Sequence, residues 1–298
     1  MSTVSDKFKF QWINMLSADG FFYQWLVADI FAIKITSPGC SAFPLFLFPL
    51  TCLTGRQYDT LNYADKEEQH MDSADNKLFD NIKENLSTAL LGDILDEMGL
   101  HHQFLHPRLQ PLAVHMRIAG RAMPVLEADY ATFPNTKSQG PLGDKAFGVM
   151  FEALDSLTEN EVYIASGSSP TYALWGGLMS TRASHLKAAG AILNGYSRDK
   201  HEILALDFPV FSRGNYAQDQ KVRGKVLDYR VPVNVDGVLI SPGDMVVADE
   251  EGVLVIPARV EQEVIGLAVE KKAMENKVRD AIAQGMGAVE AYQRFGVM

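Results

Sequence analysis

The sequence predicts an α/β fold with a mixed sheet. Helical and extended segments alternate through the first half of the regular region, and short extended segments gather in its second half. Turn sequences such as Asp236-Gly237 separate the later segments. No GxGxxG sequence follows an extended segment, so the pattern favours a mixed sheet over a doubly wound dinucleotide-binding fold.

Composition limits the classes of function. The chain has 298 residues, of which 47% are hydrophobic and 21% charged, a balance typical of one large globular domain or two small ones. The net charge of −10 argues against a nucleic-acid-binding surface, which needs a basic patch. Cys40 and Cys52 are the two cysteines and both lie in the first fifth of the chain, which leaves the rest without a thiolate metal site. This fits a reducing compartment, and we expect a cytoplasmic protein without a membrane or nucleic-acid partner.

Residues 1–71 differ from the rest and are predicted to be an extension outside the core domain at 72–298. Phe21–Ile35 is apolar but interrupted by two charged residues, and Phe43–Leu53 is broken by two prolines. Each falls short of the roughly 20 apolar residues that span a bilayer. A membrane or targeting role is the alternative. The favoured interpretation is a misassigned start, with Met71 as the true first residue.

Regular patterning begins after Asp72. Apolar residues recur every four positions from Leu78 to Met98, which predicts one amphipathic helix that Gly99 ends. A loop is expected at Pro134–Gly148. The other expected elements, in order, are a strand at Ala119–Val125, a strand at Val162–Ser166, a helix at Leu178–Ala189, strands at Ala191–Leu193, Pro209–Phe211, Val222–Val235, Val238–Ile240, Met245–Ala248 and Val253–Ile256, and a closing helix at Val260–Ala283.

Several familiar catalytic patterns are absent or weak. The sequence has neither a GxxxxGK[ST] phosphate loop nor a GxSxG nucleophile elbow. His102 and His106 could share a metal on a helix, but a flanking glycine and proline favour a solvated loop. Lys187 and Lys200 could form a Schiff base, but nothing indicates the apolar pocket that would activate a lysine.

The first candidate binding segment is Trp175-Gly176-Gly177-Leu178-Met179-Ser180. Two glycines at the junction of a loop and a helix let the backbone approach a ligand closely. The N–H groups of the first helical turn then point at an anion, so Gly176, Gly177, Leu178 and Met179 are candidates to bind a carboxylate. A tight turn before a packed helix is the structural alternative.

The second candidate segment is Asn194-Gly195-Tyr196-Ser197-Arg198-Asp199, directly after the predicted strand Ala191–Leu193. Ligands in open α/β proteins gather beyond the carboxyl ends of strands. Arg198 could clamp a carboxylate through two hydrogen bonds. Asp199 offers hard oxygen ligands for Mg²⁺ or Mn²⁺. A surface Arg–Asp pair is the alternative.

From Leu86 to the C-terminus, the order and spacing of a set of short motifs resemble the RraA-like family, which includes 4-hydroxy-4-methyl-2-oxoglutarate aldolases. The two candidate segments are among these motifs, with the glycines about twenty residues before Arg198. The others are Ser87-Thr88-Ala89-Leu90-Leu91-Gly92-Asp93, Ala119-Gly120-Arg121-Ala122, Phe208-Pro209-Val210-Phe211-Ser212-Arg213-Gly214, Ser241-Pro242-Gly243-Asp244, Ala248-Asp249 and Gly252-Val253-Leu254-Val255-Ile256-Pro257.

This resemblance implies a swivelling β/β/α-type fold assembled as a homotrimer or homohexamer, with active sites between subunits. It implies that Arg198 holds substrate, that Asp199 binds the divalent metal, and that the amides of residues 176–179 hold a carboxylate. The chain departs from the family at two positions. Aldolases of the family often have an acidic residue at the position of Gly177, and many members have aspartate at that of Asn194.

The implied activity is that of a class II aldolase that uses Mg²⁺ or Mn²⁺ and cleaves 4-hydroxy-2-oxo diacids to pyruvate. Oxaloacetate decarboxylation would pass through the same pyruvate enolate. Metal-bound water or an acidic side chain from a neighbouring subunit would transfer the proton. Glu275 is the candidate for that side chain, and an ordinary helix ion pair is its structural alternative. The competing hypothesis is a non-catalytic regulator that binds a ribonuclease, as some members of the family do.

Overall fold

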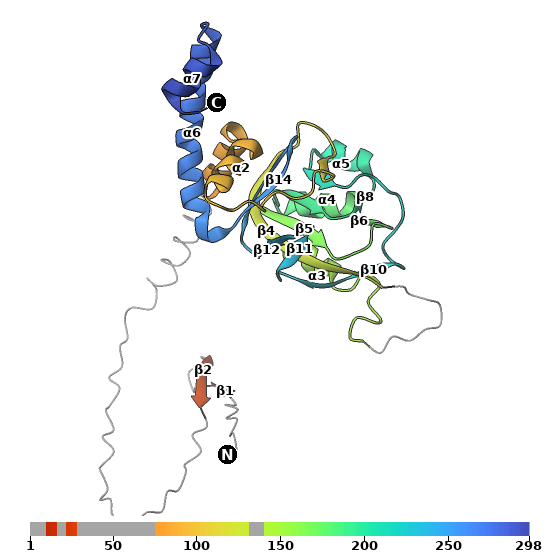
Figure 1. Ribbon diagram of the computed structural model, residues 1–298. Helices are drawn as coiled ribbons and strands as arrows, with labels where there is room; N and C mark the ends of the chain where they lie inside the picture. Colours follow the sequence, from red (N-terminus) through yellow and green to blue (C-terminus); the bar gives the residue numbers. More distant parts are fainter. Residues whose placement is uncertain (1–9, 17–21, 29–74, 131–139, 298) are drawn as a thin grey trace, which may run out of the picture. The chain divides into compact units, whose positions relative to one another are not determined.

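A mixed eight-stranded sheet forms the centre of residues 57–298, the larger of two units in the chain (Figure 1). The computed structural model describes residues 10–16, 22–28, 75–130 and 140–297. In the smaller unit, residues 1–56, β1 (Phe10–Leu16) and β2 (Phe22–Ala28) form an antiparallel hairpin that the sequence analysis did not predict. Cys40, Cys52 and the apolar stretch Phe43–Leu53 lie outside the described residues.

The sheet is organised around β4 (Ile118–Asp129), its longest strand. Four central strands are parallel, and the strands at both edges run antiparallel, which confirms the predicted mixed sheet. The order is β14 (Gly252–Ile256), β13 (Met245–Asp249), β4, β5 (Glu161–Ser166), β7 (Gly190–Leu193), β9 (Val210–Ser212) and β3 (Gln110–Pro111), with β10 (Gly224–Tyr229) beside the second half of β4.

Both faces of the sheet are covered, because alternate residues of one strand enter different cores. On β13, Met245 and Val247 belong to a core that includes a helix at residues 75–85 and α2 (Thr88–Glu97). Val246 and Ala248 point into the larger core, which includes side chains of three other helices. These helices are α3 (Met150–Asp155), α4 (Gly177–His185) and α5 (Lys200–Leu206).

The remaining elements lie at the C-terminal end and beside the sheet. A 3₁₀ turn, η1 (Ala258–Val260), leads into α6 (Glu261–Ala283), and α7 (Ala288–Phe295) follows. Figure 1 shows α6 running alongside α2 and continuing past it. Two short pairs complete the fold, β11 (Val233–Val235) with β12 (Val238–Ile240), and β6 (Ala173–Trp175) with β8 (Tyr196–Ser197).

The prediction of one helix from Leu78 to Met98 is wrong, because the chain breaks at Leu86 and Ser87. The Ser87 hydroxyl accepts a hydrogen bond from the Leu90 N–H at 3.3 Å and so caps a second helix. The start of α2 is also anchored to the sheet. The buried Asp249 carboxylate accepts hydrogen bonds from the backbone N–H and the hydroxyl of Thr88, at 2.8 and 2.6 Å.

Two further boundaries differ from the prediction. The helix expected to reach Ala189 ends at His185, and the last predicted residues form the turn into β7. The strand expected over Val222–Val235 is divided between β10 and β11. The division falls at Arg230, whose φ of 57° is incompatible with an extended strand.

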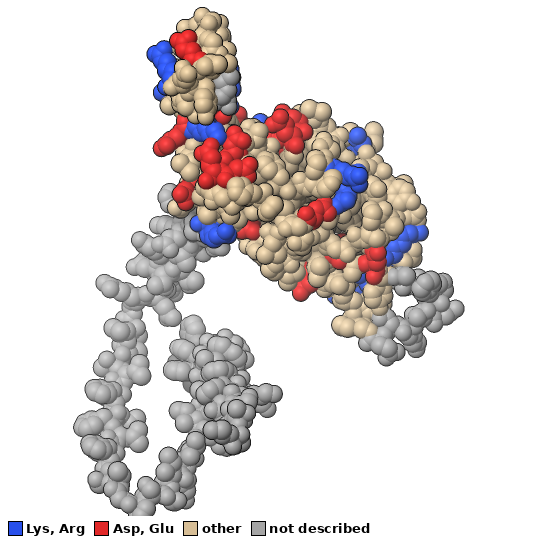
Figure 2. Space-filling view, viewed as in Figure 1, with Lys and Arg blue, Asp and Glu red and all other residues tan. Residues whose placement is uncertain are grey.

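The surface carries charge of both signs. On the face drawn in Figure 2, acidic side chains gather near α2 and α6, and lysines and arginines are scattered. Lys271 of α6 bridges Asp93 and Glu97 of α2. Among the described residues, none of the helices has the length and apolarity needed to cross a membrane.

A chain that begins at Met71 should fold like the full chain and keep its oligomeric state, for which the family resemblance predicts a trimer or hexamer. The reason is that the sheet and both cores are built from residues after position 74. Light scattering and circular dichroism on both chain lengths measure this. Loss of secondary structure or a smaller assembly in the shorter chain would show that residues 1–70 belong to the fold.

Candidate active site

The two candidate segments lie side by side. β6 and β8 pair in parallel, with Trp175 opposite Ser197, and the Arg198 N–H donates to the Trp175 carbonyl at 2.9 Å. This pairing places the start of α4 next to the start of α5. The Gly177 N–H then donates to the Asp199 carboxylate at 3.1 Å.

Gly176 makes this close approach possible. Its backbone is extended, with φ at −154°, so its role does not come from an unusual dihedral angle. A Cβ atom there would lie 2.7 Å from an Asp199 carboxylate oxygen and 3.4 Å from the Arg198 side chain. Any side chain at position 176 would therefore push Asp199 and Arg198 away from the helix start.

Asp199 occupies a strained backbone position. It is the N-cap of α5 with φ at 59°, in the left-handed region that non-glycine residues rarely adopt. Strain of this kind persists where surrounding structure holds a residue in place, and it is common at functional sites. In this backbone conformation the Asp199 carboxylate faces the start of α4, where it accepts the hydrogen bond from the Gly177 N–H.

Arg198 is held by two carboxylates. Its Nη1 donates to Asp219 at 3.0 Å, and its Nε lies 3.6 Å from the Asp199 carboxylate. The guanidinium has five N–H donors, of which these contacts use only part. Because the Arg198 side chain is 39% exposed, its remaining donors can reach a ligand in the adjoining pocket.

Glu202 supplies a carboxylate that the sequence analysis missed. A Cβ atom at Gly177 would overlap the Glu202 carboxylate, so this acidic group fills the space that a side chain at position 177 would need. Position 177 is where aldolases of the resembled family often have their own acidic residue. The missed signal was spacing, because residues three apart at the start of one helix, as Asp199 and Glu202 are, share a face.

A pocket of about 260 Å³ opens beside these residues. Polar groups of Arg198, Asp199, Asp219 and Gln220 form part of its lining, and apolar side chains form much of the rest. The full lining consists of Phe147, Met150, Phe151, Ala173, Leu174, Trp175, Gly176, Leu178, Met179, Arg198, Asp199, Asp219 and Gln220.

The donor chemistry fits a hard divalent cation. Among the described residues there is no cluster of three or more His, Cys, Asp or Glu side chains of the kind that encloses a metal. Mg²⁺ does not need such a cage, since it is usually held by one or two carboxylates and keeps several waters. Asp199 and Glu202, both at the glycine start of α4, provide carboxylates of that kind.

The other residues singled out in the sequence lie elsewhere. Asn194, at the end of β7, accepts a hydrogen bond from Arg213 at 2.8 Å and donates to Ser166 at 3.1 Å, and it does not line the pocket. His102 and His106 lie in an irregular segment, as the loop interpretation predicted.

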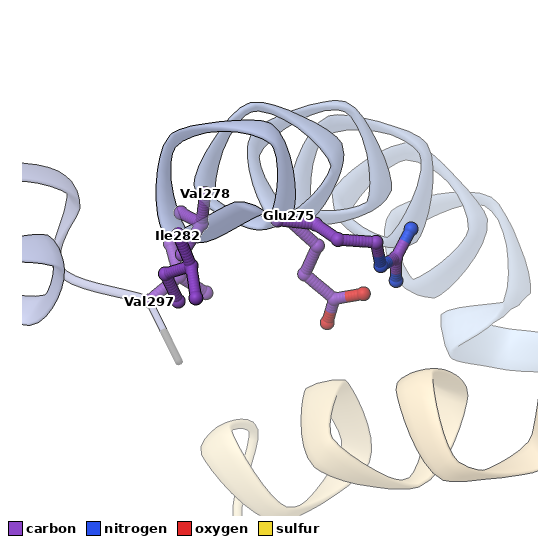
Figure 3. A pocket seen from close by; sticks show the side chains of 5 residues that line it. Glu275, Val278, Ile282 and Val297 are labelled. Atoms are coloured by element: carbon purple, nitrogen blue, oxygen red, sulfur yellow. The ribbon is translucent and has the colours of Figure 1, made fainter. Parts of the chain in front are cut away.

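Glu275 is placed away from the pocket of its own chain. It lies on α6 in a separate groove of about 450 Å³, together with Val278, Ile282 and Val297 (Figure 3). This groove shares no lining residue with the pocket beside Arg198. A role for Glu275 in the site of a neighbouring subunit stays a prediction.

Comparison with known proteins establishes the family. The model of the RraA-like family, described as aldolase/RraA, matches residues 88–255, more than half of the chain. The chain belongs to the RraA-like family. The match includes both candidate segments and Glu202, and it ends within β14.

Two relatives illustrate the family. Over 169 residues the chain is 31% identical to a Halalkalibacterium halodurans protein named "Putative 4-hydroxy-4-methyl-2-oxoglutarate aldolase", covering 57% of this chain and 80% of that protein. It is 28% identical over 212 residues to protein DlpA of Legionella pneumophila, covering 71% of this chain. That second match spans only 32% of DlpA, about a third of its length.

Solved structures confirm the RraA-like fold. An uncharacterized protein of Pseudomonas syringae is 26% identical with a TM-score of 0.64, covering 74% of this chain and 94% of that one. Streptomyces coelicolor RraAS2, described as an unusual member of the RNase ES inhibitor RraA family, has a TM-score of 0.56. Its identity of 23%, over 65% of this chain and 91% of that one, makes it a guide to the fold alone.

A buried carboxyl group supports the pocket wall. Gln220 lines the pocket, and its Nε2 donates to Glu127 of β4 at 2.8 Å. The other Glu127 oxygen is buried without a partner among the described residues. Burial raises the pKa of Glu127 to about 8, against the opposing effect of the Gln220 hydrogen bond, so this carboxyl is mostly neutral at pH 7.

Glu127→Gln should flatten the dependence of stability on pH. In the parent, the unfolded glutamate ionises near pH 4.5 while the folded one keeps its proton to about pH 8. This difference lowers the free energy of unfolding as pH rises between those values, by up to about 1.4 kcal/mol per pH unit. The glutamine variant cannot ionise, so it should lose this decline. Denaturant unfolding at pH 5, 6, 7 and 8 measures it.

Glu161→Gln is the matched control. Glu161 is also a buried glutamate, on the neighbouring strand β5, but it is paired with Arg230. Breaking that pair should lower stability and leave the decline between pH 5 and 8 in place. An unchanged decline in Glu127→Gln would contradict the assignment to Glu127.

Proposed function

We propose that the chain is a carbon–carbon lyase that uses Mg²⁺ or Mn²⁺ and releases pyruvate from 4-hydroxy-2-oxo acids, with 4-hydroxy-4-methyl-2-oxoglutarate as the first substrate to test. Oxaloacetate decarboxylation is part of the proposal, since it breaks the equivalent bond. One observation carries it. Arg198, Asp199 and Glu202 converge on the two-glycine start of α4 beside a pocket, in a chain that belongs to a family containing aldolases.

The 2-oxo acid head of the substrate is assigned to Arg198 and α4. The N–H groups of Leu178 and Met179 lie in the first turn, where helical N–H groups have no partner within the helix. They are directed at an anion and reinforced by the helix dipole. The Gly177 N–H is already bound to Asp199, so these two amides and the remaining Arg198 donors would hold the substrate carboxylate.

Asp199 would hold the divalent cation, which keeps several waters when few carboxylates bind it. When bound, the cation supplies Lewis-acid stabilisation of the negative charge that develops on the keto oxygen. The contribution of Arg198 is orientation, because a fixed carboxylate aligns the breaking bond with the keto group. Asp219 maintains that orientation by holding the guanidinium in place.

Cleavage needs a base and then an acid. The C4 hydroxyl loses its proton, the C3–C4 bond breaks, and its electron pair moves into the enolate of pyruvate. C3 of that enolate then takes up a proton. We assign proton transfer at the C4 hydroxyl to Glu202, since its carboxylate occupies the space beside Gly177.

Asp199→Ala should abolish pyruvate release, lowering kcat by at least about a hundredfold, because a site with few protein carboxylates loses its cation when one is removed. Arg198→Ala should instead raise KM and leave Mn²⁺ affinity nearly unchanged. Metal titration and steady-state kinetics with oxaloacetate separate the two effects.

Glu159→Ala is the control for these variants, since it removes an exposed ion pair with Lys187 outside the pocket. It should leave pyruvate release unchanged. Full activity and metal binding in Asp199→Ala would overturn the site and favour the alternative, a protein-binding regulator of a ribonuclease.

Glu202→Gln should lower kcat, because the amide keeps the size of the side chain but cannot accept the proton. An acidic residue returned to position 177 should restore part of the activity if space is made for it. Gly177→Asp alone is expected to be harmful because the two side chains overlap. The double variant Gly177→Asp/Glu202→Ala relieves that overlap. Activity no better in the double variant than in Glu202→Ala would count against this role.

A further inference from the structure

Two polar groups of the pocket lie on a segment that has no regular structure. Residues 216–223 lead into β10 without forming a helix or a strand, and they supply Asp219 and Gln220 to the pocket lining. A functional group on such a segment is held accurately only where packing and hydrogen bonds fix it. The contacts of this segment therefore decide where the Asp219 carboxylate lies.

Backbone hydrogen bonds give the segment its local shape. The Ala173 N–H of β6 donates to the Gln218 carbonyl at 2.9 Å. The Gln220 carbonyl accepts from the N–H groups of Arg223 and Gly224, at 2.7 and 3.0 Å. These last two bonds join residues three and four positions apart, so they close a turn without tying Gln220 to the central sheet.

The side chain of Gln220 makes that connection. Its Nε2 donates to the Glu127 carboxyl of β4 at 2.8 Å. Glu127 is 1% exposed and Gln220 is 3% exposed, so the contact lies inside one chain, whatever covers the mouth of the pocket. β4 is hydrogen-bonded to other strands on both of its sides, and Glu127 is therefore a fixed point in the molecule.

The anchored residue adjoins the carboxylate that holds Arg198. Asp219 directly precedes Gln220 in the chain and accepts a hydrogen bond from the Arg198 Nη1 at 3.0 Å. We propose that Glu127 is a positioning residue, which orients the Arg198 guanidinium by fixing residues 219–220. This inference rests on the proposed lyase function, in which Arg198 holds the 2-oxo acid head of the substrate.

The chemistry of the contact favours orientation over simple filling of space. A buried carboxyl group is unfavourable, so an apolar side chain at position 127 would suit a purely structural role better. A hydrogen bond, unlike an apolar contact, depends on direction as well as distance. The pair of Glu127 and Gln220 therefore sets where the turn lies, which is what the Asp219 carboxylate needs in order to hold Arg198.

Glu127→Met tests the contact, because methionine has a similar size but offers only a weakly accepting sulfur to Gln220. With oxaloacetate and Mn²⁺, the KM of the full-length chain should rise about tenfold, since misplacing an orienting group can lower activity by up to about a hundredfold. The values of kcat and of Mn²⁺ affinity should change little. Glu127→Gln should recover most of the loss, because an amide oxygen can accept the same hydrogen bond and the parent carboxyl is mostly neutral at pH 7.

A positioning role also predicts that the effects do not add. Arg198→Ala removes the group that is positioned, so Glu127→Met in that background should raise KM no further. Gln220→Met breaks the same contact from its other side and serves if Glu127→Met does not fold. Glu161→Gln is the control, since it breaks a buried pair with Arg230 outside the pocket. It should lower stability and leave KM unchanged.

Oxalate binding separates this inference from the lyase function. Oxalate has the adjacent oxygens of a 2-oxo acid head, and calorimetry measures its affinity for the Mn²⁺-loaded chain without turnover. It should bind Glu127→Met about tenfold more weakly than the parent, for the same loss of orientation. An unchanged KM or oxalate affinity in Glu127→Met, or a further rise of KM in the Arg198→Ala background, would overturn the positioning role while the lyase function stands.

Absence of pyruvate release by the parent chain would overturn the lyase function instead. Oxalate affinity would then decide the role of Glu127. Weaker binding in Glu127→Met than in the parent and Glu161→Gln would support it. Equal binding in all three chains, or no binding by the parent, would overturn it as well.

Discussion

The candidate site depends on the contact between the starts of α4 and α5. One hydrogen bond, from the Gly177 N–H to the Asp199 carboxylate at 3.1 Å, joins the two helix starts. It forms because Gly176 has no Cβ and because Asp199 adopts a left-handed backbone conformation. Arg198 is then fixed between Asp199 and Asp219. The positions of the charged groups therefore follow from backbone geometry, so a side chain at position 176 would displace Asp199 and Arg198, and one at position 177 would displace Glu202.

The sequence singled out the two segments of this candidate site but could not predict their contact. Both segments stood out through glycines and through an Arg–Asp pair after a buried strand. They meet through β6 and β8, which have three and two residues. Strands this short have no readable periodicity. Glu202 was missed for a related reason, since only the folded chain shows its carboxylate filling the space beside Gly177.

The central sheet was predictable and the breaks in the chain were less so. Buried strands such as β5 and β7 have apolar runs that indicate their type and position. The break between β10 and β11 depends on the positive φ of Arg230. An arginine in the sequence does not predict this conformation, because non-glycine residues rarely adopt it. Serine is a preferred N-cap, so Ser87 could have indicated the start of a second helix. The apolar residues on both sides keep the same helical spacing, which instead favoured one continuous helix.

Charge balance links the departure at Gly177 to the proposed chemistry. Two carboxylates, Asp199 and Asp219, lie beside the Arg198 guanidinium, and Glu202 places a third beside Gly177, so the starts of α4 and α5 carry an excess of negative charge. A divalent cation would offset that excess and leave room for one substrate carboxylate. An acidic residue at position 177 in addition to Glu202 would add a fourth carboxylate where there is no space for it. Glu202 of α5 therefore places a carboxylate in the space that a side chain at position 177 of α4 would need, so the site has an acidic group there although position 177 is glycine.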